Sequence, residues 1–119
     1  MARILLADDD PTTLDLVART LVADGHEVLR CQDGQEALQQ LTSGAKPFDL
    51  LLTDVEMPAL DGIELARRVA EAKPGIRILL MSGFSDPKQA SPGVPIAGFI
   101  SKPLSLDQLR SAVRSALAS

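Results

Sequence analysis

The fold is decided by residues 48–58, which read FDLLLTDVEMP. The segment 48–53 is short and apolar at its centre, a pattern that predicts a strand buried on both faces. Asp54 ends this strand, and a turn through Glu56 and Pro58 follows. A strand of this kind has to be covered by other elements on both sides.

The flanking sequence supplies those elements, because short apolar runs alternate with stretches of helical periodicity. Further strands are predicted over 2–7, 27–31, 76–81 and 96–101, and helices over 11–24, 34–42, 61–72 and from 106 onward. Asp10 is interpreted as the N-cap of the first helix, with Pro11 at its first position. Ser105 and Gln108 are typical of a capping box for the last helix, whose inner stripe is predicted to include Leu106.

Apolar strands joined by helical crossovers indicate an α/β fold, close to (βα)5, with a parallel sheet covered on both faces. The segment 83–103 departs from this pattern, since seven of its 21 residues are Gly or Pro. A full helix is not expected there. The fourth helix is therefore predicted to be short or irregular, with at most about two turns near residues 86–90.

Composition narrows the function classes. The 119 residues predict a single domain spanning 1–119. Twelve Lys and Arg against 16 Asp and Glu give a net charge of −4 and a pI near 4.8, which argues against nucleic acid and anionic membranes as partners. A single cysteine, Cys31, with a single histidine, His26, excludes an internal disulfide and a zinc cage. Without a long apolar run or a leader, a cytoplasmic protein is expected.

Polar side chains follow four of the predicted strands. Asp8 and Asp9 follow the first strand, and Asp54, Ser82 and Lys102 follow the third, fourth and fifth. The carboxyl ends of parallel strands meet at one edge of the sheet, where ligands of open α/β sheets bind. Converging carboxylates repel one another unless a cation offsets them, and hard oxygen ligands favour Mg²⁺. A carboxylate nucleophile, a hydroxyl and an ammonium would suit phosphoryl transfer.

These residues resemble the receiver domain of two-component response regulators. The similarity covers residues 3–116 and rests on the acidic pair Asp8-Asp9, the segment from Leu51 to Pro58 with Asp61-Gly62 behind it, Met81-Ser82-Gly83, and Ser101-Lys102-Pro103. The resemblance implies a flavodoxin-like three-layer sandwich with strand order 2-1-3-4-5. It also implies a phosphoacceptor signalling domain, not an enzyme acting on a separate substrate, that catalyses its own phosphorylation and dephosphorylation.

The residue-by-residue match assigns the expected roles. Asp54 would accept a phosphoryl group from a histidine kinase or histidine phosphotransferase. Asp9 would bind Mg²⁺ directly, Asp8 through water, and the backbone carbonyl of Glu56 would complete the protein ligands together with Asp54. Lys102 would neutralise a phosphoryl oxygen. Ser82 would move toward the phosphoryl group, and Phe99 would follow it as the switch aromatic, remodelling a face that binds an unknown output protein.

Several alternatives stay open at this level. Asp8-Asp9-Asp10-Pro11-Thr12 also satisfies the D-x-D-x-T pattern of haloacid-dehalogenase-like phosphatases, in which Asp8 would be the nucleophile and Asp10 the general acid. A receiver that binds partners without phosphorylation is the third reading. Phe99 is alternatively a core-edge aromatic, and the Glu56 side chain either influences phosphoryl hydrolysis or is simply solvated. A stand-alone receiver and one cut from a larger protein both fit the sequence.

Overall fold

The computed structural model describes residues 2–43, 47–83 and 93–118. Strands and helices alternate along most of this length. The elements in chain order are β1 (Arg3–Ala7), α1 (Pro11–Ala23), β2 (Glu27–Cys31), α2 (Gly34–Ser43), β3 (Leu50–Asp54), α3 (Gly62–Ala72), β4 (Arg77–Ser82), β5 (Gly98–Ser101) and α5 (Leu106–Ala118). The predicted alternation is confirmed across these elements.

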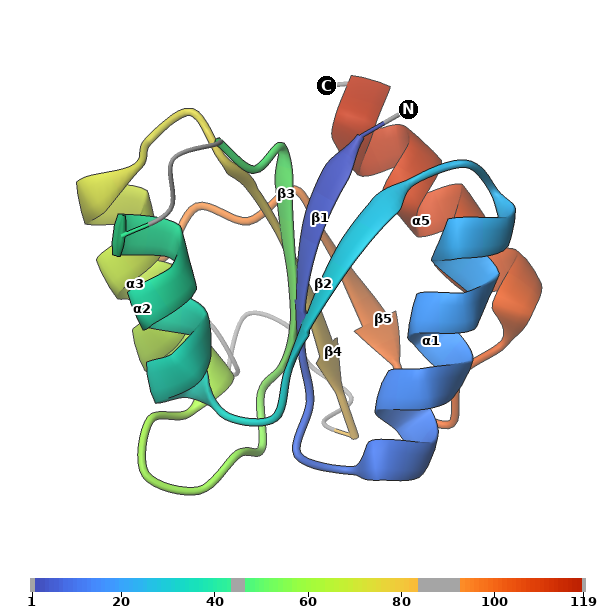
Figure 1. Cartoon of the computed structure of the whole chain (residues 1–119), viewed down its shortest axis with the longest axis horizontal. Coiled ribbons are helices and arrows are strands. Elements are labelled where there is room, and N and C mark those ends of the chain that lie inside the picture. Colours follow the sequence, from blue (N-terminus) through green and yellow to red (C-terminus); the bar gives the residue numbers. More distant parts are fainter. Residues whose placement is uncertain (1, 44–46, 84–92, 119) are drawn as a thin grey trace.

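The five strands form one parallel sheet in the order β2-β1-β3-β4-β5. This is the order that the resemblance implied. Helices α1 and α5 cover one face of the sheet, and α2 and α3 cover the other (Figure 1). The chain therefore has the expected flavodoxin-like three-layer arrangement.

The core divides into two apolar clusters, one on each face of the sheet. Alternate side chains of β1 show the division, because Ile4 and Leu6 pack with the α1 and α5 side while Leu5 packs with the α2 and α3 side. All residues of β3 are buried. The sequence-based expectation of a strand covered on both faces is confirmed for the stretch that decides the fold.

Element ends differ from the predictions by one or two residues, with one clear error. Strand β3 begins at Leu50, not at 48, and the Asp49 carboxylate accepts a hydrogen bond from the Arg3 backbone N–H at 2.8 Å just before it. The prediction that Leu106 belongs to the inner stripe of the last helix is wrong, since this residue is 38% exposed. It lies at the first position of α5, ahead of the turns that face the sheet.

The predicted cap at Asp10 is confirmed, and the Ser105 side-chain contact of the predicted capping box is present. The Asp10 side chain accepts a hydrogen bond from Thr12 N–H at 3.2 Å, and Ser105 Oγ accepts one from Gln108 N–H at 3.4 Å. The predicted short fourth helix falls largely on residues 84–92, which lie outside the described residues. No helix in the described ranges has the length and apolar character needed to cross a membrane.

Candidate functional site

The carboxyl edge of the sheet gathers the five residues singled out from the sequence. Asp8 and Asp9 follow β1, Asp54 and Ser82 are the last residues of β3 and β4, and Lys102 directly follows β5. The parallel register sets their relative heights, because Asp54 pairs with Met81 and Ser82 pairs with Ser101. The sheet therefore brings together at one edge side chains that are up to 94 residues apart in sequence.

Three carboxylates form a cluster on this edge. One oxygen from each of Asp8, Asp9 and Asp54 lies within 4.8 Å of the others. Asp8 is fully buried and Asp54 is 3% exposed, whereas Asp9 is exposed. The cluster is thus a buried pair of acids with a third acid at its solvent side.

Among the described residues, Lys102 supplies the positive charge of the site. Its Nζ lies 3.1 Å from Asp54 Oδ1 and 3.5 Å from Asp8 Oδ2. Asp8 Oδ1 also accepts a hydrogen bond from Asp10 N–H at 2.9 Å. Asp54 Oδ1 is buried and, within the described residues, accepts no hydrogen bond of good geometry despite its proximity to the ammonium. One ammonium therefore faces two buried carboxylates, and one carboxylate oxygen is left under-satisfied.

Burial dominates the protonation of the two inner acids. Burial, together with the charges of Asp8 and Glu56, raises the pKa of Asp54 to about 6, although Lys102 opposes the shift. Burial also raises the pKa of Asp8 above its ordinary value. For Lys102, burial alone would lower the pKa, but the two carboxylates outweigh burial and raise it. The site holds more negative charge than its own cation neutralises.

This donor set fits a hard divalent cation. Carboxylate oxygens are the ligands that Mg²⁺ prefers, and the cluster offers three of them at one solvent-accessible point. The buried, under-satisfied Asp54 Oδ1 is the observation that a second positive charge would explain. The residues present therefore fit the Mg²⁺ expected from the sequence.

The side chain of Glu56 has a definite position that sequence reasoning left undecided. Its Oε2 accepts a hydrogen bond from Ser82 Oγ at 2.8 Å, and its Oε1 accepts one from Gly83 N–H at 3.0 Å. Ser82 is fully buried, while Glu56 is exposed. No local pattern predicts this contact, because Glu56 and Ser82 are 26 residues apart in the sequence. The only signal was that Glu56 lies two residues after Asp54.

The backbone at Gly62 packs closely against the backbone of Asp54. Asp61 caps α3 by accepting a hydrogen bond from Glu64 N–H at 2.8 Å, and Gly62 N–H donates to the Val55 carbonyl at 2.9 Å. A Cβ placed on Gly62 would lie 2.1 Å from the Asp54 carbonyl oxygen. Only glycine therefore fits at this position, which ties the start of α3 to the end of β3.

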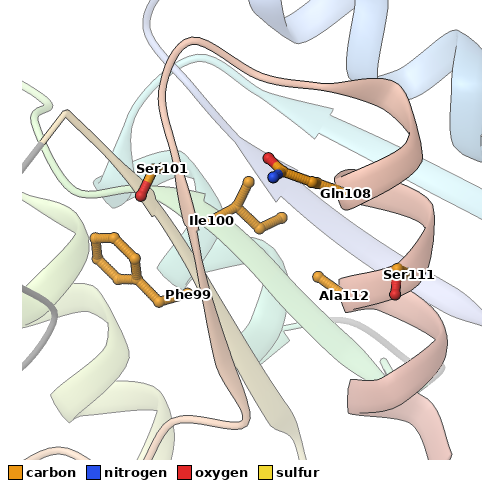
Figure 2. A pocket seen from close by; sticks show the side chains of 6 residues that line it. All are labelled: Phe99, Ile100, Ser101, Gln108, Ser111 and Ala112. Atoms are coloured by element: carbon orange, nitrogen blue, oxygen red, sulfur yellow. The ribbon is translucent and has the colours of Figure 1, made fainter. Parts of the chain in front are cut away.

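Phe99 lies on β5 at the rim of a pocket of about 370 Å³ between β5 and α5. Figure 2 shows its ring on the opposite side of the strand from Ile100, which points toward Gln108 and Ala112 of α5. Phe99 is half-buried and packs against the core on the α2 and α3 side. Its core-edge position is therefore clear, and a switching function stays a prediction.

The remaining candidates carry ordinary structural contacts. Asp10 accepts hydrogen bonds from Thr13 Oγ1 and Thr12 N–H, and these hold the pKa of its carboxyl below the usual range. A carboxyl kept ionised in this way is poorly suited to act as a general acid. Burial raises the pKa of the Cys31 thiol to about 12, so this cysteine is unreactive. His26 accepts a hydrogen bond from Ala2 N–H through Nδ1 at 3.2 Å.

The fold and the edge cluster together define a class of protein. The response regulator receiver domain family matches residues 4–114, so the chain belongs to this family. Its members are signalling domains of two-component systems, with a phosphoacceptor function general to the family. Family membership also removes the basis for the phosphatase interpretation.

Particular relatives sharpen this assignment. The chain is 42% identical over 85 residues to the response regulator receiver protein CpdR of Brucella abortus. The aligned region covers 71% of this chain and 69% of that protein. It spans only 26% of the length of transcriptional regulatory proteins such as ZraR of Salmonella typhimurium. The match to CpdR therefore covers more than two thirds of both proteins, whereas the match to ZraR covers about a quarter of that protein.

Solved structures agree with the observed fold. Chemotaxis protein CheY4 of Vibrio cholerae superposes with a TM-score of 0.89 at 30% identity, covering 98% of this chain and 99% of that chain. Response regulator TrrA of Thermotoga maritima, solved in complex with Mg²⁺ and BeF, gives a TM-score of 0.82 at 30% identity over 98% of this chain and all of that one. Both similarities extend over essentially the whole domain.

Proposed function

We propose that this receiver domain is a Mg²⁺-dependent phosphoacceptor in which Asp54 carries the phosphoryl group. The observation that carries the proposal is the buried Asp54 carboxylate, which has an under-satisfied Oδ1, lies beside Lys102 and shares its pocket with Asp8 and Asp9. A carboxylate that is short of compensating positive charge is suited to bind a cation and then a phosphoryl group beside it.

The proposed reaction is a transfer between two side chains. A carboxylate oxygen of Asp54 attacks the phosphorus of a phosphohistidine on the donor protein. The new P–O bond forms as the P–N bond breaks, and the donor imidazole departs. The signal would end by hydrolysis. Water attacks the phosphorus of the acyl phosphate, which releases inorganic phosphate and restores the Asp54 carboxylate.

The cation site would be formed by Asp8, Asp9 and Asp54, with the backbone carbonyl of Glu56 as a further ligand. When bound, Mg²⁺ would neutralise charge that develops on the phosphoryl oxygens. Lys102 already lies between the two buried carboxylates, and from that position its ammonium would hold a phosphoryl oxygen. Ser82 would donate a hydrogen bond to another oxygen, and Phe99 would change rotamer with it.

The proposed phosphoryl donor is a sensor histidine kinase or a histidine phosphotransferase. The proposed output partner is an unidentified protein that binds the face formed by β5 and α5. We propose action as a single receiver domain spanning 1–119, signalling by contact. The 42% identity over 85 residues to the receiver protein CpdR supports this proposal. A cytoplasmic location and the lack of a nucleic-acid partner stay predictions.

The first test is the intact mass of the protein after incubation with acetyl phosphate, with and without Mg²⁺. Wild type is expected to gain one phosphoryl group only with Mg²⁺, and Asp54→Asn is expected to gain none. Asp49→Asn is the matched control, because it makes the same change at the opposite edge of the sheet.

Two outcomes would contradict the proposal. Modification that persists in Asp54→Asn but is lost in Asp8→Asn would return the phosphatase reading. A wild-type protein that gains no mass under any condition, while folded by circular dichroism, would favour a binding module that works without phosphorylation.

A further inference from the structure

We propose that Glu56 is a resting-state latch that occupies the Ser82 hydroxyl and the Gly83 N–H and so opposes activation. The inference rests on the proposed function, because it concerns the same site before phosphorylation. Its basis is the two-pronged contact described above, in which the two carboxylate oxygens accept separately from Ser82 Oγ at 2.8 Å and from Gly83 N–H at 3.0 Å.

The contact joins two segments that no local structure links. Glu56 belongs to the turn after β3, and Ser82 and Gly83 form the end of β4 and the residue beyond it. The adjacent backbone is already held by Val55 N–H, which donates to the Met81 carbonyl at 2.9 Å. The Glu56 side chain therefore continues the β3–β4 pairing past the last ladder bond, as far as Gly83.

The latch competes directly with the expected function of Ser82. A serine hydroxyl has one hydrogen to donate, so it cannot serve the Glu56 carboxylate and a phosphoryl oxygen at the same time. The same limit holds for the single N–H of Gly83. Phosphorylation would therefore have to break at least the Ser82 contact, and a protein held in the latched state would bind a phosphoryl group less tightly.

The position of Glu56 suits a contact that opens and closes. Glu56 is exposed, so its carboxylate can return to water when released, with only a modest net loss of hydrogen-bond energy. Ser82 is fully buried. The glutamate is thus the partner that can exchange this contact for water.

The variant Glu56→Asp distinguishes the proposed hydrogen-bonded latch from simple repulsion between the Glu56 charge and the phosphoryl group. Aspartate keeps the negative charge but shortens the side chain by one carbon–carbon bond, so it cannot hold both partners. The matched control is Glu71→Asp, the same change on the exposed surface of α3. Beryllofluoride with Mg²⁺ serves as the phosphoryl probe.

Two readouts are measured on ¹⁵N-labelled protein. Without the probe, the Gly83 amide proton is expected to move upfield in Glu56→Asp, because its charge-assisted hydrogen bond is lost. In titrations, Glu56→Asp is expected to bind beryllofluoride about tenfold more tightly than wild type, since the latched state no longer competes. Glu71→Asp is expected to match wild type in both. In a Ser82→Ala background the gain from Glu56→Asp is expected to shrink.

Each contrary outcome has a distinct meaning. An unchanged Gly83 amide in Glu56→Asp would overturn the contact itself. A shifted amide with wild-type affinity would overturn its opposition to activation. A gain that is undiminished in the Ser82→Ala background would show that Glu56 does not act through Ser82. A wild-type protein that binds no beryllofluoride would refute both the proposed function and the latch that rests on it. The other three outcomes would refute the latch alone.

Discussion

The two edges of the sheet handle charged side chains in opposite ways. At the amino edge, Arg3 forms an ion pair with Glu27 at 2.6 Å, in which Arg3 is half-buried and Glu27 is exposed. At the carboxyl edge, Asp8 and Asp54 are buried and share a single Lys102. Exposed pairs contribute little to stability, whereas buried unbalanced charge is costly. The comparison indicates that the carboxyl edge is maintained for binding at the expense of stability.

The largest effect that would separate the edges is expected from glycine substitutions. Gly62→Ala places a Cβ 2.1 Å from the Asp54 carbonyl, and no side-chain rotation relieves a backbone clash. We expect a loss of about 3 kcal/mol or more in the free energy of unfolding, measured by urea denaturation. Gly75→Ala, in the turn before β4 with open space around it, is expected to stay within about 0.5 kcal/mol of wild type. Equal losses at the two sites would contradict the close packing assigned to the carboxyl edge.

Removing one partner of the ion pair at each edge tests the burial argument. Lys102→Met leaves two buried carboxylates without their partner and is expected to destabilise the metal-free protein by about 2–4 kcal/mol at pH 8. The loss is expected to shrink at pH 5, where Asp54, with a pKa of about 6, is largely protonated. Glu27→Gln breaks the exposed amino-edge pair and is expected to cost under about 1 kcal/mol. A Lys102→Met loss independent of pH would argue that lost packing, and not charge, is responsible.

Neutralising Asp54 is expected to stabilise the metal-free protein. Because the folded pKa of about 6 lies above the ordinary 3.8, the folded state binds this proton more tightly than the unfolded state. The contribution of Asp54 to wild-type stability therefore falls as pH rises from about 4 through 6. Asp54→Asn escapes this loss and should gain about 2 kcal/mol at pH 8 and nothing near pH 4, measured by urea denaturation in EDTA.

The control for that experiment lies at the other edge. The Asp49 carboxylate accepts a hydrogen bond from Arg3 N–H at 2.8 Å, so Asp49→Asn is expected to lose about 0.5–1.5 kcal/mol instead of gaining stability. Destabilisation by Asp54→Asn at pH 8 would contradict the assignment of a strained charge cluster to the carboxyl edge.

The smallest of these effects is expected from the metal. Mg²⁺ at ten times its dissociation constant should stabilise wild type by about 1.4 kcal/mol, because it binds the folded acidic cluster and not the unfolded chain. The melting temperature measured with MgCl₂ against an NaCl control of equal ionic strength reports this gain. Asp54→Asn and Asp8→Asn should lose most of the response, while Asp24→Asn, on the surface beside Arg110, should keep it. A response of equal size in all four proteins would indicate a general salt effect.

Much of the site could be predicted because its chemistry lies at strand ends. Asp54 and Ser82 each close a short apolar run, and Lys102 follows another, so a parallel sheet has to deliver all three to one edge. The caps at Asp10 and Ser105 were predictable for a similar reason, since capping is a local interaction between neighbours in sequence. Leu106 was misassigned because helical periodicity does not reveal which first-turn positions extend beyond the covering sheet.

The alternation of strand and helix, the aliphatic core and the identity of the residues at the carboxyl edge were determined by the sequence itself, because period and strand-end chemistry are properties of neighbouring residues. The tertiary structure alone decided which of those residues touch. It placed Lys102 between Asp8 and Asp54, and joined Glu56 to Ser82 and Gly83. These contacts depend on the distance and register between strands that are remote in the chain, which no local pattern encodes.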